Sequence, residues 1–172
     1  GLYLAVIILW VTSFLALYRT LRQSDLAASL FGSVLGIFGL AVLAVSALPH
    51  VATAPISDLY HASGTSPEDQ AALVLIWQAT QGIFDALLAV GLLIVPIGIV
   101  LLGMAMLRSP AFGRGLARFS IVLGLVGALT AAFDIVAGTS QIAAIGVLGL
   151  IVFHLVVGWR LYRLSRLAHD SI

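Results

Sequence analysis

The chain has 172 residues, of which 62% are hydrophobic and only 9% are charged, and its mean hydropathy is +1.18. A soluble domain of this length cannot bury so large an apolar fraction in one core, so the composition excludes a soluble globular protein and predicts an integral membrane protein. The formal charge is +1, all the Lys+Arg positions are arginines, and the absence of cysteine excludes disulfides, thiolate metal sites and cysteine nucleophiles.

The first apolar segment, residues 2–18, follows Gly1 directly and has neither a basic leading stretch nor a small-residue cleavage signal. We therefore expect a membrane span with sequence missing upstream of it. Trp10 lies in the middle of this segment, away from the interfacial positions that tryptophan favours. We expect its ring to pack against a neighbouring helix.

Four further segments approach the roughly 20 apolar residues that a helix needs to cross a hydrocarbon core of about 30 Å. They are residues 27–48, 82–107, 116–137 and 142–159. Backbone groups find no water partner in lipid, so these segments are expected to be helical. The sequence predicts one domain over residues 1–172, an all-α polytopic bundle with five visible transmembrane helices.

The connection between the second and third spans, residues 49–70, contains two early prolines and a Gly-Thr-Ser break, and we expect it to be a polar outer loop. Its end has the pattern of a helix start, with Ser66 as N-cap, Pro67 in the first helical position and Asp69 completing a capping box. A helix from residue 67 to 107 would be about 60 Å long, roughly twice the hydrocarbon thickness. Its first turns are expected to project outside the membrane.

The eight arginines fall in three clusters, one after the first span, one after the third and one after the fifth. They are Arg19 and Arg22, then Arg108, Arg114 and Arg118, then Arg160, Arg163 and Arg166. The connections at residues 49–70 and 138–141 contain no basic side chain other than histidine. The positive-inside rule therefore predicts a bacterial cytoplasmic membrane protein with the visible N-terminus outside and the C-terminus in the cytoplasm.

Polar groups in the third span form a stripe at helical spacing. Trp77, Gln81 and Asp85 are four residues apart and Gln78 lies close to the same face. Facing lipid they would be costly, so we expect them to face the bundle or an outer vestibule. Pro96 should kink the same helix, either as a structural feature or as a gating hinge.

Asp134, in the outer third of the fourth span, is predicted to lie at a depth similar to that of Asp85. The two carboxylates, with His50 and His61 of the outer loop, would suit a cation or a proton relay. Alternatively, Asp134 bonds the turn at residues 138–140 while Asp85 pairs with a glutamine or water. No spacing typical of metal ligands occurs, so no metal site is expected.

His154 lies inside the fifth span, six residues before Arg160. It is a candidate ligand for haem iron or chlorophyll magnesium. The alternative is a histidine that is satisfied by contacts between helices, and this alternative is favoured because the position four residues earlier, Leu150, is not the small residue of light-harvesting helices.

Glycines at close helical spacing predict tight helix packing, either within a compact bundle or against another membrane subunit. They are Gly32, Gly36 and Gly39 in the second span, Gly124 and Gly127 in the fourth, and Gly146 and Gly149 in the fifth.

Four stretches carry a resemblance to a known family. They are "LALYRTLRQSDLAAS", "GIVLLGMAML", "RSPAFGRGLARFSIVLGLVGAL" and "FHLVVGWRLYRLSR". Together they resemble the DUF4386-type proteins, small bacterial integral membrane proteins known only as a domain of unknown function. The resemblance implies one more span before the first, giving six passes with both ends inside, and it supplies no catalytic residues.

We therefore expect a protein without enzyme activity or a nucleic-acid partner, embedded in the lipid bilayer. The leading hypothesis is an accessory subunit that packs against other membrane subunits, or against itself, through glycine-rich faces. The first alternative is a small transporter or ion- or proton-conducting protein that uses Asp85 and Asp134. The second is a haem- or chlorophyll-binding subunit that uses His154, whereas the leading hypothesis needs no cofactor.

Overall fold

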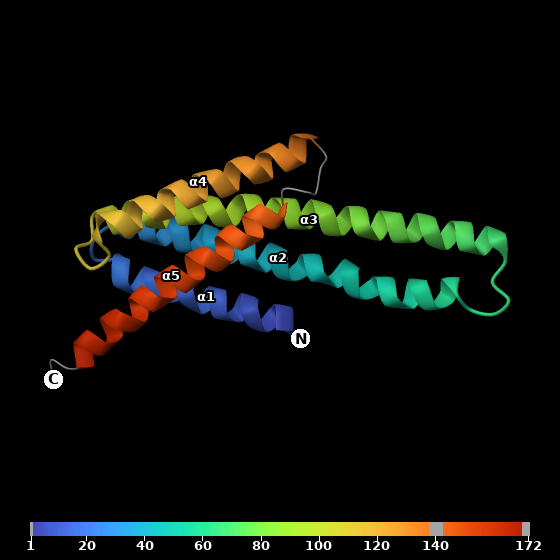
Figure 1. Cartoon of the computed structure of the whole chain (residues 1–172), viewed down its shortest axis with the longest axis horizontal. Coiled ribbons are helices and arrows are strands. Elements are labelled where there is room, and N and C mark those ends of the chain that lie inside the picture. Colours follow the sequence, from blue (N-terminus) through green and yellow to red (C-terminus); the bar gives the residue numbers. More distant parts are fainter. Residues whose placement is uncertain (1, 138–142, 170–172) are drawn as a thin grey trace.

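The computed structural model describes residues 2–137 and 143–169, and five α-helices make up this part of the chain (Figure 1). They are α1 (Leu2–Leu21), α2 (Leu26–Tyr60), α3 (Pro67–Leu107), α4 (Gly113–Ala137) and α5 (Ala143–His169). All five are long and apolar enough to cross a membrane. The predicted all-α polytopic bundle is confirmed, and the chain is a membrane protein.

Helices α2 and α3 run antiparallel, and glycines bring their backbones into contact. A Cβ atom added to Gly98 would lie 2.6 Å from the carbonyl oxygen of Gly32 and 2.7 Å from the backbone nitrogen of Gly36. A Cβ atom on Gly39 would meet the backbone nitrogen of Val95 at 2.8 Å. The predicted packing face of α2 is therefore used inside the chain.

Helix α4 packs on the other side of α3, around Pro96. A Cβ atom on Gly124 would lie 2.7 Å from the carbonyl oxygen of Pro96, and one on Gly127 would lie 3.0 Å from the proline ring. Helix α3 remains a continuous α-helix through this proline. The pair of small residues in α4 makes room for the proline ring between the two helices.

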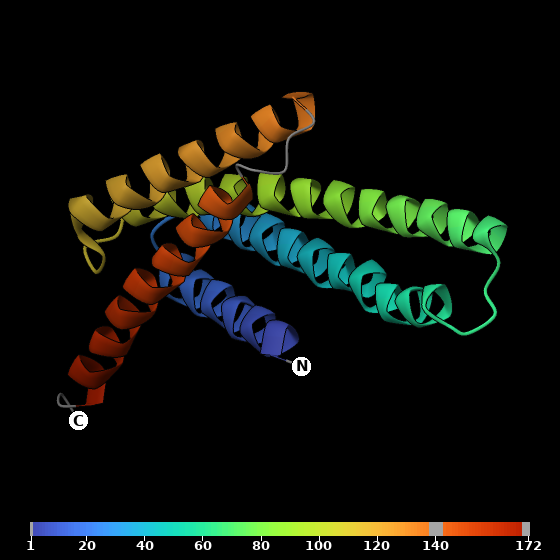
Figure 2. The same ribbon diagram turned by 45° about the vertical axis from the view of Figure 1, so that its right-hand side comes forward.

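Helix α5 crosses the other helices obliquely and packs more loosely (Figures 1 and 2). Cβ atoms on Gly146 and Gly149 would meet their nearest neighbours at 3.7 Å and 3.5 Å, which is ordinary van der Waals contact. It also packs against α1, where Phe14, Leu17, Phe153 and Val157 are fully buried in the core.

The predicted outer loop at residues 49–70 is wrong in its first half. Helix α2 continues through Pro49 and Pro55 to Tyr60, so the connection shrinks to residues 61–66. Each internal proline removes one backbone hydrogen bond. The helix persists because one face of it packs along α3. The half-buried positions of this part of α2 have the spacing of a single helix face, and they are Pro49, Thr53, Ile56 and Tyr60.

The predicted start of the long helix is confirmed. The Asp69 amide donates to the Ser66 hydroxyl at 3.1 Å, and that hydroxyl donates to the Asp69 carboxylate at 2.7 Å. Helix α3 then runs for 41 residues to Leu107, as the sequence predicts. The side-chain amide of Gln70 donates to the carbonyl of Tyr60 at 3.3 Å and closes the tip against α2.

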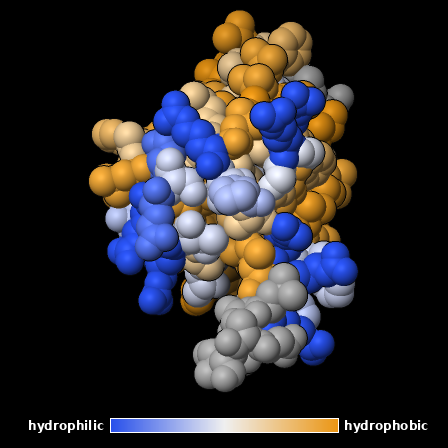
Figure 3. All heavy atoms as spheres, turned by 90° about the vertical axis from the view of Figure 1, so that its left-hand side faces the viewer, coloured by the Kyte–Doolittle hydropathy of each residue, from blue (hydrophilic) through white to orange (hydrophobic). Residues whose placement is uncertain are grey.

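All eight arginines lie toward one end of the bundle, which we call the arginine end. It comprises the α1–α2 connection, the α3–α4 turn and the C-terminal turns of α5. Figure 3 views this end and shows hydrophilic side chains spread over it with hydrophobic surface around them. Asp25 pairs with Arg108 here at 2.5 Å, and Arg160 donates from Nε to the carbonyl of Ala111 at 2.9 Å.

Candidate functional site

At the opposite end, α2 and α3 extend well beyond the other three helices (Figure 1). About 20 residues of helix cross a hydrocarbon core of about 30 Å. Twenty residues counted from the start of α2 end near residue 45, and twenty counted back from the end of α3 end near residue 88. We call residues 46–87 the projecting hairpin.

The projecting hairpin is held together by a narrow seam. Along α3, its half-buried side chains include Gln70, Leu73 and Phe84. The Phe84 ring lies 5.5 Å from the imidazole of His50 across the seam. Because only one face of each helix is used, the rest of the hairpin surface is open.

Large apolar side chains stand on that open surface. Val51 is 71% exposed and Leu75 is 66% exposed. Their exposed neighbours along the hairpin are Leu48, Leu59, Val74, Ile76, Trp77 and Ile83. Side chains of this kind suit lipid in the membrane-spanning part, but beyond the hydrocarbon they would face water. An apolar surface in water indicates a binding surface.

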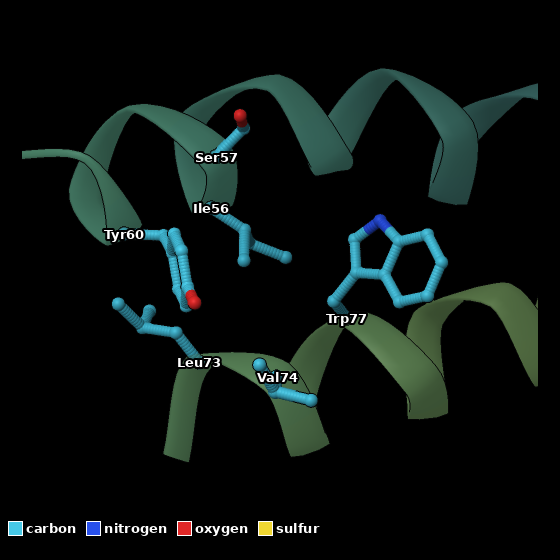
Figure 4. Close-up of a pocket in the computed structure, with 6 residues that line it drawn as sticks. All are labelled: Ile56, Ser57, Tyr60, Leu73, Val74 and Trp77. Atoms are coloured by element: carbon cyan, nitrogen blue, oxygen red, sulfur yellow. The ribbon is translucent and has the colours of Figure 1, made fainter. Parts of the chain in front are cut away.

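An apolar groove of about 200 Å³ opens between the two helices of the hairpin (Figure 4). Tyr60 from α2 and Trp77 from α3 stand at its two ends, and Ile56 points into the space between them. The remaining lining residues are Ser57, Leu73 and Val74. Aromatic rings flanking an aliphatic floor suit a bulky apolar side chain of a binding partner.

A second, more open hollow of about 440 Å³ lies at the hairpin tip and shares Leu73 with the groove. Asp69 borders it beside Leu59 and Ile76. The charged side chains of residues 26–107 are Asp58, Glu68, Asp69 and Asp85, with no arginine or lysine among them. The hairpin therefore combines apolar hollows with negative charge.

The polar stripe of α3 lies on the hairpin. Gln78 and Asp85 are exposed and Gln81 is half-buried, so the five-helix bundle does not enclose the stripe. Asp85 lies eleven residues beyond Pro96 on α3 and so about 16 Å farther from the arginine end. By the same count, this position falls close to the end of a hydrocarbon-thick layer, where a carboxylate could reach water.

Asp134 belongs to α4 and does not lie on the projecting hairpin. It is buried in α4, and it lies seven residues beyond Gly127, about 10 Å past the level of Pro96. Asp85 is thus about 6 Å farther out along the bundle, and exposed instead of buried. The turn at residues 138–140, the predicted partner of Asp134, lies outside the described residues. In the described ranges, no group of three His, Cys, Asp or Glu side chains has metal-site geometry.

His154 is buried in an aromatic cluster between α1 and α5. Its imidazole stacks on the Trp10 ring with centroids 4.5 Å apart, and Phe14 and Phe153 meet it edge-on at 5.6 Å and 5.3 Å. Nδ1 donates to the carbonyl of Leu150 at 2.7 Å. Nε2 is buried and has no hydrogen-bond partner among the described residues. Because this nitrogen is buried, a porphyrin iron could reach it only after neighbouring side chains moved.

The sequence matches the family described as a domain of unknown function, DUF4386, over residues 2–164. The chain belongs to the DUF4386 family. No curated protein and no solved structure matches it. The resemblance drawn from the four sequence stretches is thereby confirmed, and the match includes the whole projecting hairpin of this DUF4386 protein. The family description carries no activity, so function has to be argued from the geometry of the site.

The sequence of this DUF4386 chain does not predict the groove, because the residues that line its α2 side fall within the connection that is expected to be a loop. Ile56 and Tyr60 were placed in the polar connection, so they had no helix face to share with Leu73 and Trp77 across the hairpin. A signal was present, since Thr53, Ile56 and Tyr60 are spaced three and four residues apart. The two prolines obscured it.

Proposed function

We propose that this protein is a non-enzymatic accessory subunit that binds a partner membrane protein through its projecting hairpin. One observation carries the proposal: large apolar side chains such as Val51 and Leu75 stay exposed on a part of the chain that extends beyond a hydrocarbon-thick layer. Their exposure to water is unfavourable by roughly 25 cal/mol for each Å² of apolar surface, and a partner would remove that cost.

The chemistry of the hairpin defines the partner. Its groove fits a bulky apolar side chain, and Asp69 borders the neighbouring hollow. The occupant is therefore a basic amphipathic segment of another membrane protein, with an apolar anchor for the groove and an arginine or lysine for the acidic tip. The positive-inside rule assigns the arginine end to the cytoplasm, so this contact occurs on the outer side of a bacterial cytoplasmic membrane.

The glycine-rich faces are not the basis of this contact. Gly36, Gly98 and Gly124 are already in close contact with neighbouring helices of the same chain. This revises the expected docking mode for α2 and α4, whose glycine faces pack within the chain, whereas Gly146 and Gly149 of α5 make only ordinary van der Waals contact. A transport function has less support, because Asp85 and Asp134 differ in depth and in burial.

Site-specific photocrosslinking in cells tests the proposal. A photoreactive side chain at Ile76, which is exposed on the hairpin, should give an adduct with one membrane protein, attached at a segment that contains basic and apolar residues. Leu129 of α4 is the control, because it is also apolar and exposed but lies within a helix that is expected to span the membrane. It should label lipid.

Two sets of variants sharpen this test. Trp77→Ala removes one wall of the groove and should reduce the yield of the Ile76 adduct about tenfold or more, as expected for an aromatic anchor. Asp58→Asn with Glu68→Gln should reduce it less. Adducts with lipid alone at Ile76, adducts with a second copy of this chain, or the same protein adduct from Leu129 would each contradict the proposal.

A further inference from the structure

The C-terminal turns of α5 carry a row of neighbouring aromatic and arginine side chains in cation–π contact. The guanidinium carbon of Arg163 lies 6.0 Å from the centre of the Trp159 ring, and that of Arg166 lies 5.0 Å from the centre of the Tyr162 ring. The two rings are 6.0 Å apart. We call these four residues the arginine–aromatic ladder.

The ladder occupies one face of α5. At about 100° per residue, its four members fall within a sector of roughly 100°. Val157, Leu161 and Leu164, which are buried or packed against the core, lie on the opposite face. Arg160, on the flank, donates to the carbonyl of Ala111 in the α3–α4 turn, and this bond fixes which face of α5 points outward.

The ladder is open to its surroundings. Trp159 is 63% exposed and Tyr162 is also exposed, and both arginines are exposed. In the described part of the chain, Arg108 forms an ion pair with Asp25, and no carboxylate pairs with Arg163 or Arg166. The rings lie within cation–π distance of the two guanidinium groups, and such a contact leaves N–H donors of a guanidinium available to an oxyanion.

Its place in the molecule favours a lipid over a protein ligand. Helix α5 slopes away from α1 toward its C-terminus, so the outward face of its last turns is not covered by another helix of the chain (Figure 2). Tryptophan and tyrosine prefer the boundary between hydrocarbon and head groups, and arginine reaches from that depth to phosphate.

We infer that the arginine–aromatic ladder binds the phosphate groups of anionic lipids in the leaflet at the arginine end. The guanidinium groups donate to phosphate oxygens, and the neighbouring rings hold them at the level of the head groups through cation–π contacts. This binding differs from the general attraction of a basic surface, because it requires the rings as well as the charge.

The test uses the full chain in bilayers of phosphatidylcholine that contain spin-labelled phosphatidylglycerol or spin-labelled phosphatidylcholine. The fraction of label immobilised by the protein gives the preference for the anionic lipid. Arg163→Gln with Arg166→Gln should remove most of that preference, because the charged donors to the phosphate oxygens are lost. Trp159→Leu with Tyr162→Leu keeps the charge and should also lower it.

The matched control is Arg114→Gln with Arg118→Gln, a second exposed pair at the same end of the molecule without aromatic stacking. This pair should retain most of the preference. Equal losses in the two arginine pairs, an unchanged preference after removal of both rings, or no preference in the unaltered protein would each overturn the inference. So would arginine-dependent binding of inorganic phosphate to the detergent-solubilised protein without a lipid preference in bilayers. Unchanged helix content in every variant, measured by circular dichroism, excludes misfolding as the cause.

Discussion

At the scale of single residues, glycines determine how closely the helices approach. Two glycines of α3 differ only in what faces them. A Cβ atom on Gly98 would collide with the backbone of Gly32 and Gly36, whereas a Cβ atom on Gly82 would meet nothing within 4 Å. The same substitution at the two sites therefore separates helix propensity from helix packing.

Gly98→Ala should lower the free energy of unfolding by about 1 to 3 kcal/mol, because α2 and α3 must separate to admit the methyl group. Gly82→Ala should leave it unchanged or raise it by up to about 1 kcal/mol, because alanine favours the helix and nothing opposes the side chain. Thermal unfolding in detergent, followed by circular dichroism, measures both. Equal effects at the two sites would show that the backbones are not in contact.

His154 illustrates what the sequence could and could not predict about a buried residue. The mid-span position of Trp10 predicted a contact with another helix, and the ring stacks on His154. The sequence had no means of identifying that partner, since the pairing depends on how α5 crosses α1. Nor does it reveal that Nε2 lacks a protein partner in the described part of the chain.

His154→Phe should therefore leave the unfolding midpoint unchanged or raise it. The variant keeps a ring against Trp10 and removes a buried acceptor, whose desolvation is unfavourable by about 1 to 3 kcal/mol. His154→Ala, which leaves a cavity, should lower the midpoint. A lower midpoint for His154→Phe, together with loss of a visible absorption band from the purified protein, would instead indicate a bound cofactor at Nε2.

At the scale of helices, local signals predicted the bounds of α3 and the start of α2, but not the end of α2. The start of α3 depends on Ser66 and Asp69, which are three residues apart, so the capping chemistry can be read directly from the sequence. The end of α2 depends on packing against α3 along its whole length. That packing outweighs the cost of Pro49 and Pro55, and no local pattern contains it.

Asp25 joins two helices at the arginine end. Its carboxylate accepts from the Ala28 amide at 3.0 Å as the N-cap of α2, and it pairs with Arg108 at the end of α3. Arg108 is 69% exposed and Asp25 only 11%, so water screens the ion pair and the cap should contribute more.

Asp25→Ala should lower the free energy of unfolding by about 1 to 2 kcal/mol through loss of the cap and the pair together. Asp25→Ser keeps a capping oxygen, and Arg108→Gln keeps the cap intact. Each should have an effect below about 1 kcal/mol. Chemical denaturation in detergent measures the free energy of unfolding of the three variants and so ranks them. An effect of Arg108→Gln as large as that of Asp25→Ala would mean that the ion pair dominates.

At the scale of the whole molecule, the arginines lie toward one end of the bundle, and the exposed apolar hairpin with its acidic tip lies at the other. The arginines, spaced in three clusters along the sequence, predicted that separation. The groove between Ile56 and Trp77 could not be predicted in the same way, because it exists only where two helices are in register beyond the rest of the bundle. The account depends on the hairpin standing outside the membrane, opposite the arginines.

Single-cysteine labelling in intact cells tests that arrangement most directly, and the absence of native cysteine makes it clean. Ser63→Cys at the hairpin tip should react with a membrane-impermeant maleimide added outside the cells. Gly115→Cys, at the arginine end, should react only after the cells are permeabilised. Labelling of Gly115→Cys in intact cells, or protection of Ser63→Cys under the same conditions, would contradict the account.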